Sequence, residues 1–228
     1  FPGHEIDLYA VLYPARQVGG DLYDFFIHEN TLFFAIGDVS GKGIPASLLM
    51  ASTISLLRTL SSGSNSPSQI AYSLNNSIAE RNEADMFVTF FIGMLDLRTG
   101  VMKYCNAGHT PPVLTSPDRT VAFFEMQSDL PLGILKNHDY QEYTYRFVSG
   151  SGILLYTDGV TDAENEKNEF YTRERLLEIV TQNQELHPRE FIRSIINDIQ
   201  SHIKSHELSD DLSMLTFIYG SEWNIKKS

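Results

Sequence analysis

The order of the expected strands and helices constrains the fold of this chain more than any other feature of its sequence. Alternating or continuous apolar runs predict strands over 6–13, 22–28, 32–39, 88–97, 101–106, 113–115, 121–125, 143–147, 152–156 and 213–219. Helical spacing of apolar residues predicts helices over 45–60, 67–84, 172–183 and 188–205. Pro45 fits the first turn of the first helix, and Ser66 is the expected cap of the second.

Strands and helices do not alternate in this order, which argues against a doubly wound parallel sheet. The close spacing of turn residues indicates antiparallel pairing, with hairpins at 29–31 and around Ser149-Gly150. We therefore expect an α+β fold, a four-layer α-β-β-α sandwich of two antiparallel sheets flanked by helix pairs. A length of 228 residues without an internal repeat or linker favours a single domain over 1–228.

Composition and charge exclude several classes of protein. The hydrophobic fraction of 42% supports a large core and excludes a disordered chain. The net charge of −12 argues against nucleic-acid binding and against direct contact with an anionic membrane. One cysteine, Cys105, allows no internal disulfide, and we find no run of about 18 apolar residues and no signal-peptide layout. These features predict a cytoplasmic setting.

The chain begins Phe1-Pro2-Gly3 without a Met. We therefore expect it to be the C-terminal fragment of a longer regulatory protein.

Aspartates stand at the ends of the expected core strands. They are Asp21 before 22–28, Asp38 at the end of 32–39, Asp158 after 152–156, and Asp210 and Asp211 before 213–219. A carboxylate beside a buried run is costly unless it is paired or binds a metal, and few Lys or Arg stand nearby. Turn formation explains any single Asp equally well, but it is the weaker explanation for all of them together. We expect four to five carboxylates to meet in one place.

Such a carboxylate cluster favours divalent cations, which relieve the repulsion between the acids. Oxygen ligands suit hard ions, so Mn2+ or Mg2+ is expected. Two ions that share a carboxylate hold a bridging water whose pKa falls from 15.7 to roughly 7. The resulting hydroxide can attack phosphorus in line, and the predicted chemistry is two-metal phosphate hydrolysis.

Five motifs in order support this chemistry: PARQVGGDLYDFF, AIGDVSGKGIPASLLMA, NAGHTPPVL, LYTDGVTDAEN and SDDLSMLTF. They resemble the bacterial SpoIIE-type (RsbU-like) branch of the metal-dependent Ser/Thr protein phosphatase (PPM) family, from about Pro2 to Tyr219. The resemblance implies an α-β-β-α sandwich with a two-metal site at one end of the paired sheets.

The resemblance also implies roles for individual residues. Asp38 is similar to the carboxylate that bridges both metal ions, and with Asp21 it is assigned to catalysis. The implied metal ligands are Asp21, Asp38, the Val39 carbonyl, Asp158, Asp210 and Asp211. Lys42 and His109 are expected to contact substrate, whereas Asp24 and Asp162 are expected to be structural or to support the metal ligands from behind.

Three positions depart from the family pattern. Lys42 stands where many relatives carry His, Thr110 where Asn often follows the Gly-His pair, and Tyr171 where a Gly is common. None is an implied metal ligand, so we expect these departures to affect substrate handling rather than activity.

We therefore expect an Mn2+- or Mg2+-dependent phosphatase that removes phosphate from phosphoserine or phosphothreonine by attack of a metal-bridging hydroxide, without a phosphoenzyme. The family's usual substrate is a small phosphorylated regulatory protein, such as a STAS-type anti-sigma-factor antagonist. The resemblance also suggests a dimer formed through an upstream linker. The alternatives are a non-catalytic, partner-binding signalling module of the same fold and a phosphohydrolase of small molecules such as nucleotides.

Other motifs carry weaker signals. Gly41-Lys42-Gly43 lacks the Ser or Thr and the glycine spacing of a nucleotide-binding loop. Cys105 is expected to be a buried thiol, with a Cys-His pair as the weaker alternative. His109 lies in a Gly-Pro turn, where a structural hydrogen bond is an alternative to substrate contact. His202 and His206 share a helix face without the Glu of a zinc protease, so we expect a solvated face.

Overall fold

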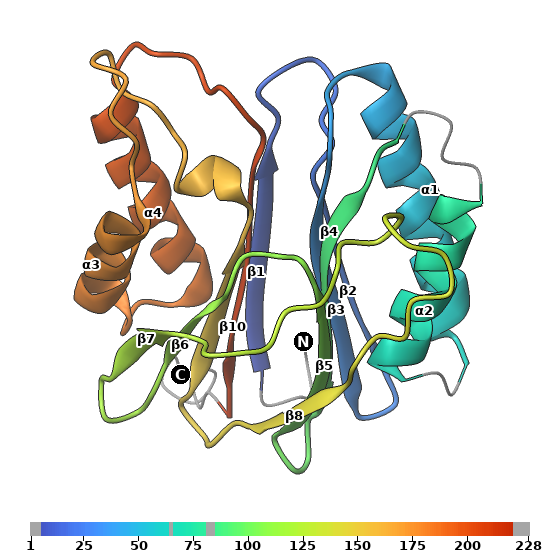
Figure 1. The fold of residues 1–228 in the computed structure, drawn as a ribbon. Helices are drawn as coiled ribbons and strands as arrows, with labels where there is room; N and C mark the ends of the chain where they lie inside the picture. Colours follow the sequence, from blue (N-terminus) through green and yellow to red (C-terminus); the bar gives the residue numbers. More distant parts are fainter. Residues whose placement is uncertain (1–5, 64–65, 81–84, 221–228) are drawn as a thin grey trace. The chain divides into compact units, whose positions relative to one another are not determined.

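The computed structural model describes residues 6–63, 66–80 and 85–220, and its strands and helices follow the predicted order (Figure 1). Internal contacts divide the chain into two compact units. Unit 1 contains Phe1–Ala15, Thr110–Glu125 and Phe147–Ser228, and unit 2 contains Arg16–His109 and Met126–Arg146.

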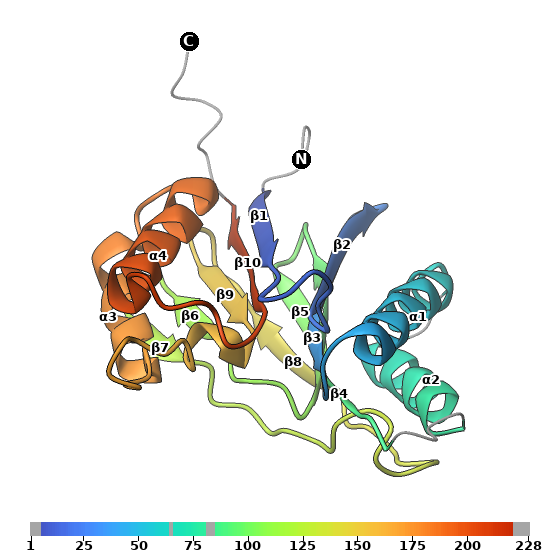
Figure 2. The same cartoon turned by 90° about the horizontal axis from the view of Figure 1, so that it is seen from above.

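Unit 2 is an antiparallel sheet with two helices packed on one face (Figure 2). Its strands, in spatial order, are β2 (Leu22–His28), β3 (Thr31–Val39), β4 (Val88–Asp96), β5 (Val101–Ala107) and β8 (Tyr143–Arg146). The helices are α1 (Ile44–Ser61) and α2 (Pro67–Ala79). Side chains alternate across a strand, so Ala35, Val39 and Phe90 share one face, where they pack with Leu57 of α1 and Leu74 of α2.

Unit 1 has the same plan with different strands. In spatial order they are β1 (Ile6–Tyr13), β10 (Leu212–Tyr219), β9 (Gly152–Tyr156), β6 (Val113–Thr115) and β7 (Val121–Phe123). A short 3-10 helix, η1 (Asp158–Val160), follows β9, and α3 (Arg173–Asn183) and α4 (Pro188–Ile203) complete the unit. Leu154 and Met214 of the sheet share a core with Leu176 of α3 and Ile195 of α4.

The helix starts follow the predicted capping chemistry. The Ser66 hydroxyl accepts the Gln69 N–H, and the Gln69 side chain accepts the Ser66 N–H, so a full capping box begins α2. Pro45 lies in the first turn of α1, after Gly43 at a φ of 81°. Two antiparallel sheets with a helix pair on each confirm the predicted α+β class.

Three local predictions are corrected. The hairpin around Ser149-Gly150 is wrong, because β8 pairs with β5 whereas β9 pairs with β10 and β6. The second helix ends at Ala79, and residues 81–84 of its predicted extension lie outside the described residues. The short helix η1 was not predicted, because a single turn carries no periodic pattern.

The helix α1 corrects the expectation that the chain has no apolar segment long enough to span a membrane. By length and composition alone it is apolar enough to cross a membrane. One such helix is weak evidence for a membrane span, and 22% of the residues of α1 are buried, among them Ala46, Thr53 and Leu57.

Candidate metal centre

In unit 2, Asp21 and Asp38 lie at opposite positions where β2 begins and β3 ends. Leu22 pairs with Gly37, and the same register continued by one residue sets Asp21 across from Asp38. A Cβ on Gly20 would lie 3.0 Å from the Val39 carbonyl oxygen, so the two strands stay close one residue further on. Asp21 is only 2% exposed. The register therefore brings two carboxylate residues together at the end of the sheet.

Strand alternation gives Asp21 and Asp24 different surroundings. Asp24 points to the helix-covered face, where both of its oxygens accept hydrogen bonds from Arg58 of α1. This bidentate ion pair raises the pKa of Arg58, chiefly through the hydrogen bond. The structural role predicted for Asp24 is confirmed. The sequence analysis expected few Lys or Arg near the acids and did not identify Arg58 as a partner of Asp24. Arg58 is distant in sequence and contacts Asp24 only because α1 packs on the sheet.

The first turn of α1 holds the segment that precedes Asp21. The Ser47 hydroxyl lies 2.9 Å from the Gly19 carbonyl oxygen and 3.0 Å from that of Gly43. Lys42 is exposed in the loop that joins Asp38 to this helix. The GKG glycines therefore serve the turn into α1, as their φ angles of 93° and 81° require.

His109 supports the strand beside Asp38. Its Nδ1 lies 3.0 Å from the hydroxyl of Thr89, and Thr89 pairs directly with Asp38 across β3 and β4. Asn106 fixes the histidine backbone, because its amide accepts the His109 N–H at 2.8 Å and donates to the His109 carbonyl at 3.1 Å. His109 is buried, at 4% exposure. It is thus a structural hydrogen-bonding residue one side chain away from Asp38.

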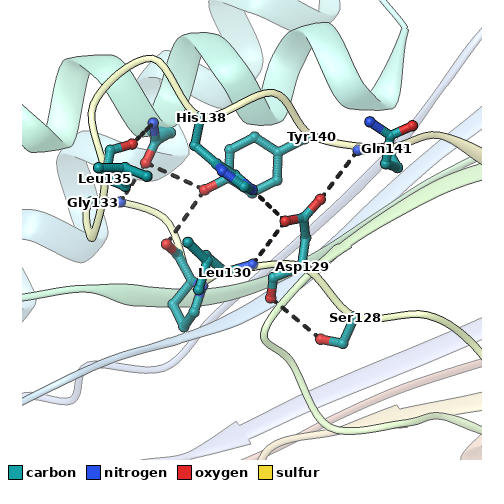
Figure 3. A network of polar contacts seen from close by, with 10 residues as sticks. Ser128, Asp129, Leu130, Gly133, Leu135, His138, Tyr140 and Gln141 are labelled. Atoms are coloured by element: carbon teal, nitrogen blue, oxygen red, sulfur yellow. Dashed lines mark hydrogen bonds and ion pairs between the residues drawn. The ribbon is translucent and has the colours of Figure 1, made fainter.

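A long irregular segment, 126–142, braces the same strands, and sequence reasoning missed it. Leu132 exchanges two backbone hydrogen bonds with Val88, at 2.8 and 2.9 Å, and Val88 pairs with Val39. Figure 3 shows how the segment holds its own shape: the Asp129 carboxylate contacts His138 and accepts the N–H groups of Leu130 and Gln141. The segment has no periodic pattern, so its turn residues were the only sequence signal that could have indicated an ordered loop here.

In unit 1, Asp158 and Asp211 are brought together by a close backbone contact. A Cβ on Gly159 would lie 1.9 Å from the Asp211 carbonyl oxygen, so only glycine allows η1 to approach the start of β10 this closely. Thr157 reinforces the contact, because its N–H donates to the Ser213 carbonyl and its hydroxyl accepts the Ser213 N–H, both at 3.0 Å. Asp158 is exposed at this position.

The Asp210-Asp211 pair has local partners. The Asp211 carboxylate accepts the Ala15 N–H at 2.8 Å, and the Asp210 carboxylate accepts the Asp211 N–H at 2.9 Å. Asp162, expected to be structural, accepts the Thr161 hydroxyl through its carboxylate, and its N–H donates to the Asp158 carbonyl. These bonds help to orient the acids.

The donor set fits Mn2+ or Mg2+, because every predicted ligand is an oxygen. Each unit holds three of the six predicted ligands: Asp21, Asp38 and Val39 in unit 2, and Asp158, Asp210 and Asp211 in unit 1. Among the described residues of either unit, no three His, Cys, Asp or Glu side chains are grouped so that they could hold a metal ion. The expected meeting of four to five carboxylates is therefore not seen within one unit.

Cys105 is buried in the core of unit 2, as predicted. Burial, together with the nearby charges of Asp129 and Glu142, raises the pKa of its thiol to about 12. A thiol that keeps its proton at neutral pH is a poor nucleophile. The Cys-His alternative is not supported, since His109 bonds to Thr89 and Asn106.

Comparison with known proteins places this geometry in a family. The family model of Stage II sporulation protein E (SpoIIE) matches residues 28–218. The phosphoserine phosphatase RsbU of Bacillus subtilis is 29% identical over 211 residues, which cover 92% of this chain and 62% of RsbU. Protein IcfG of Synechocystis is 29% identical over 235 residues, which cover 90% of this chain and 37% of IcfG. The chain therefore spans less than two thirds of either relative.

Solved structures agree on the fold. The SiaA-PP2C domain of Pseudomonas aeruginosa matches 93% of this chain and 85% of its own, with a TM-score of 0.82 at 16% identity. RsbX, solved in complex with magnesium, matches 96% of both chains with a TM-score of 0.71 at 18% identity. The fold is thus of the α+β class and of the PP2C type. The match over 28–218 and this fold lead to one conclusion: the chain belongs to the SpoIIE family.

Proposed function

We propose that this protein is a metal-dependent phosphoprotein phosphatase that hydrolyses phosphoserine or phosphothreonine. The observation that carries the proposal is the opposition of Asp21 and Asp38 at adjacent strand ends, with Asp38 inside the range 28–218 that matches the SpoIIE family model. Two carboxylates so close together repel one another unless a cation lies between them. RsbU and RsbP, both phosphoserine phosphatases by name, support the reaction class.

The proposed ligands are those implied by the family motifs. Asp38 is proposed to bridge two ions, and the remaining oxygen donors are Asp21, the Val39 carbonyl, Asp158, Asp210 and Asp211. When bound, Mn2+ or Mg2+ would supply positive charge for the phosphoryl group and a water of lowered pKa. The carboxylates of the chain form no covalent bond in this scheme, so their task is to place charge and orient water.

The contacts around these acids suggest how the chain supports them. Thr89, fixed by His109, lies beside Asp38 on the same face of the sheet and steadies that strand end. For His109 this indirect role is proposed beside the substrate contact expected from the sequence, which stays a prediction; the residue is 4% exposed. Lys42 is exposed beyond Asp38 and is proposed to contact the substrate phosphate.

The substrate is proposed to be a small phosphorylated regulatory protein in the cytoplasm, such as a STAS-type anti-sigma-factor antagonist. The similarity to RsbU supports this class. The chain spans 62% of RsbU, and we propose that it is the catalytic part of a longer regulatory protein. A dimer formed through an upstream linker stays a prediction.

The test measures phosphate release from a phosphoserine protein with Mn2+, with Mg2+ and with excess chelator. Metal-dependent release is expected. Release that persists in excess chelator would refute the metal mechanism. Binding of the phosphoprotein without release would favour the non-catalytic signalling module, and release from nucleotides alone would favour the small-molecule phosphohydrolase.

A further inference from the structure

A hairpin in unit 1 joins Asp158 to the helix pair. The chain leaves η1, turns at 165–168 and returns to α3, and the two arms are bonded along their length. The Thr172 N–H donates to the Thr161 carbonyl at 2.8 Å, and the Tyr171 N–H donates to the Ala163 carbonyl at 2.9 Å. The returning arm therefore holds the outgoing arm in place.

The base of this hairpin is bonded to Asp158 itself. The Asp158 carbonyl accepts the Asp162 N–H at 2.8 Å, and the Thr161 hydroxyl lies 3.1 Å from the same carbonyl and 3.0 Å from Asp162 Oδ1, so these two acceptors share its one hydrogen. Thr161 is bonded both to Asp158 and to the returning arm. A displacement of the returning arm would therefore move Thr161, and Thr161 would in turn move Asp158.

Beside the hairpin lies a polar group that we name the Asp198 cluster: Tyr171, which is buried, and Arg175, Asp198 and His202, which are partly exposed. The Tyr171 hydroxyl donates to Asp198 Oδ2 at 2.6 Å. Arg175 donates to both oxygens of the same carboxylate, at 2.9 and 3.0 Å. Tyr171 is 1% exposed, so its hydroxyl depends on this partner. The cluster ties the returning arm to both α3 and α4.

His202 completes the cluster and corrects the expectation of a solvated face. Its Nδ1 lies 3.0 Å from an Arg175 nitrogen, which can only donate. Its Nε2 lies 2.9 Å from the Glu169 carbonyl, which can only accept. The neutral ring with its hydrogen on Nε2 satisfies both bonds, so His202 fastens the returning arm at a second point.

The charges of the cluster strengthen its central bond. The hydrogen bonds from Arg175 lower the pKa of Asp198, and burial raises the pKa of Tyr171. At neutral pH Asp198 is therefore charged and Tyr171 keeps its proton. A hydroxyl that donates to a carboxylate forms a short, strong hydrogen bond.

We propose that the Asp198 cluster positions Asp158 for metal binding, with Tyr171 as the residue that connects them. The inference rests on the proposed function, because it takes Asp158 as a metal ligand. It also gives a reason for the departure at Tyr171, where a Gly is common: the tyrosine side chain supplies a bond to α4 that a glycine lacks.

The test compares Tyr171→Phe with Thr216→Val. Both changes remove one buried hydroxyl from unit 1, but Thr216 bonds to the Ile153 carbonyl at 2.8 Å and does not touch the hairpin. Amide hydrogen exchange over 158–172 is measured without metal, and Mn2+ affinity is measured by calorimetric titration. In Tyr171→Phe we expect exchange to rise and Mn2+ affinity to fall, each by about 5-fold, the effect of one such bond. Thr216→Val is expected to lower the unfolding temperature without either change.

The outcomes distinguish a failure of the proposal about the Asp198 cluster from a failure of the proposed phosphatase function. Faster exchange with unchanged Mn2+ affinity would make the cluster merely structural and overturn the proposal, as would equal behaviour of the two variants. A wild type that binds no Mn2+ would overturn it as well. A wild type that binds Mn2+ but releases no phosphate would refute the proposed function alone, with the Mn2+ comparison still valid. If Tyr171→Phe does not fold, Asp198→Asn, which keeps the shape of the acceptor, is judged by the same two measurements.

Discussion

Gly159→Ala is the substitution for which the geometry makes the sharpest prediction. The new methyl group would lie 1.9 Å from the Asp211 carbonyl oxygen, whereas real contacts of this kind essentially never fall below 3.0 Å. The backbone of η1 and the start of β10 therefore have to separate by at least 1.1 Å. The obstacle is backbone rather than a flexible side chain, so no rotamer change can relieve it.

The cost follows from the bonds beside this contact. Thr157 and Ser213 share two hydrogen bonds of 3.0 Å, and a displacement of this size carries both beyond bonding distance. Two lost bonds of about 1 kcal/mol each and an overpacking cost of about 1–3 kcal/mol give a loss of roughly 3–5 kcal/mol. For a chain of this length, that loss lowers the unfolding midpoint by roughly 10 °C.

Thermal unfolding followed by circular dichroism measures this effect. Gly41→Ala is the matched control, because Gly41 has a φ of 93° and open space around its Cβ position, so only backbone strain is added. That strain costs about 1–2 kcal/mol, and the control is expected to unfold at a distinctly higher temperature than Gly159→Ala. If Gly159→Ala unfolded within about 2 °C of the wild type, a shift expected from 1 kcal/mol or less, the close contact would not exist in solution.

Two further predictions concern the proposed chemistry and the buried thiol. Asp38→Asn is expected to lower the rate of phosphate release by about a hundredfold or more, since a proposed bridging charge is lost. A folded Asp38→Asn protein with most of its activity would remove that role. Cys105→Ala is expected to keep its turnover and to lose stability less steeply above pH 9, in urea unfolding at several pH values. The reason is that the unfolded thiol, with a pKa of 9.0, loses its proton while the folded thiol, at about 12, keeps it, so stability falls as pH rises. Equal slopes for both proteins would contradict this assignment.

The element order could be predicted because each strand and helix carries its own periodic pattern. The pairing of β8 could not be predicted, since a turn such as Ser149-Gly150 signals a reversal of the chain and not the sheet that the next strand joins. The same limit applies to Arg58. Nothing near Asp24 in sequence reveals its partner, because the ion pair depends on how α1 packs on β2.

In the candidate site, too, some features could be predicted from the sequence and others could not. The motifs placed Asp21 and Asp38 at strand ends, and the register of β2 and β3 explains why they face each other. Support from outside the motifs could not be predicted. The Asp198 cluster joins residues from two helices and a hairpin, and His202 looked like a surface residue because its partners lie far away in sequence. The surroundings of such residues are set by tertiary contacts and cannot be predicted from the local sequence pattern.

The pairing of β1 with β10 has a consequence for synthesis on the ribosome. Ile6 pairs with Tyr219 and Tyr13 with Leu212. The first strand of the described chain therefore cannot form its pairing until the last strand has been synthesised. Until then, β1 and β9 present open edges, which are prone to pair with other chains. Unit 2 ends at Arg146, so its sheet can form while the remainder is still being made. A nascent chain that stalls before Leu212 would therefore carry a folded half beside an aggregation-prone half, and would be a natural client for chaperones.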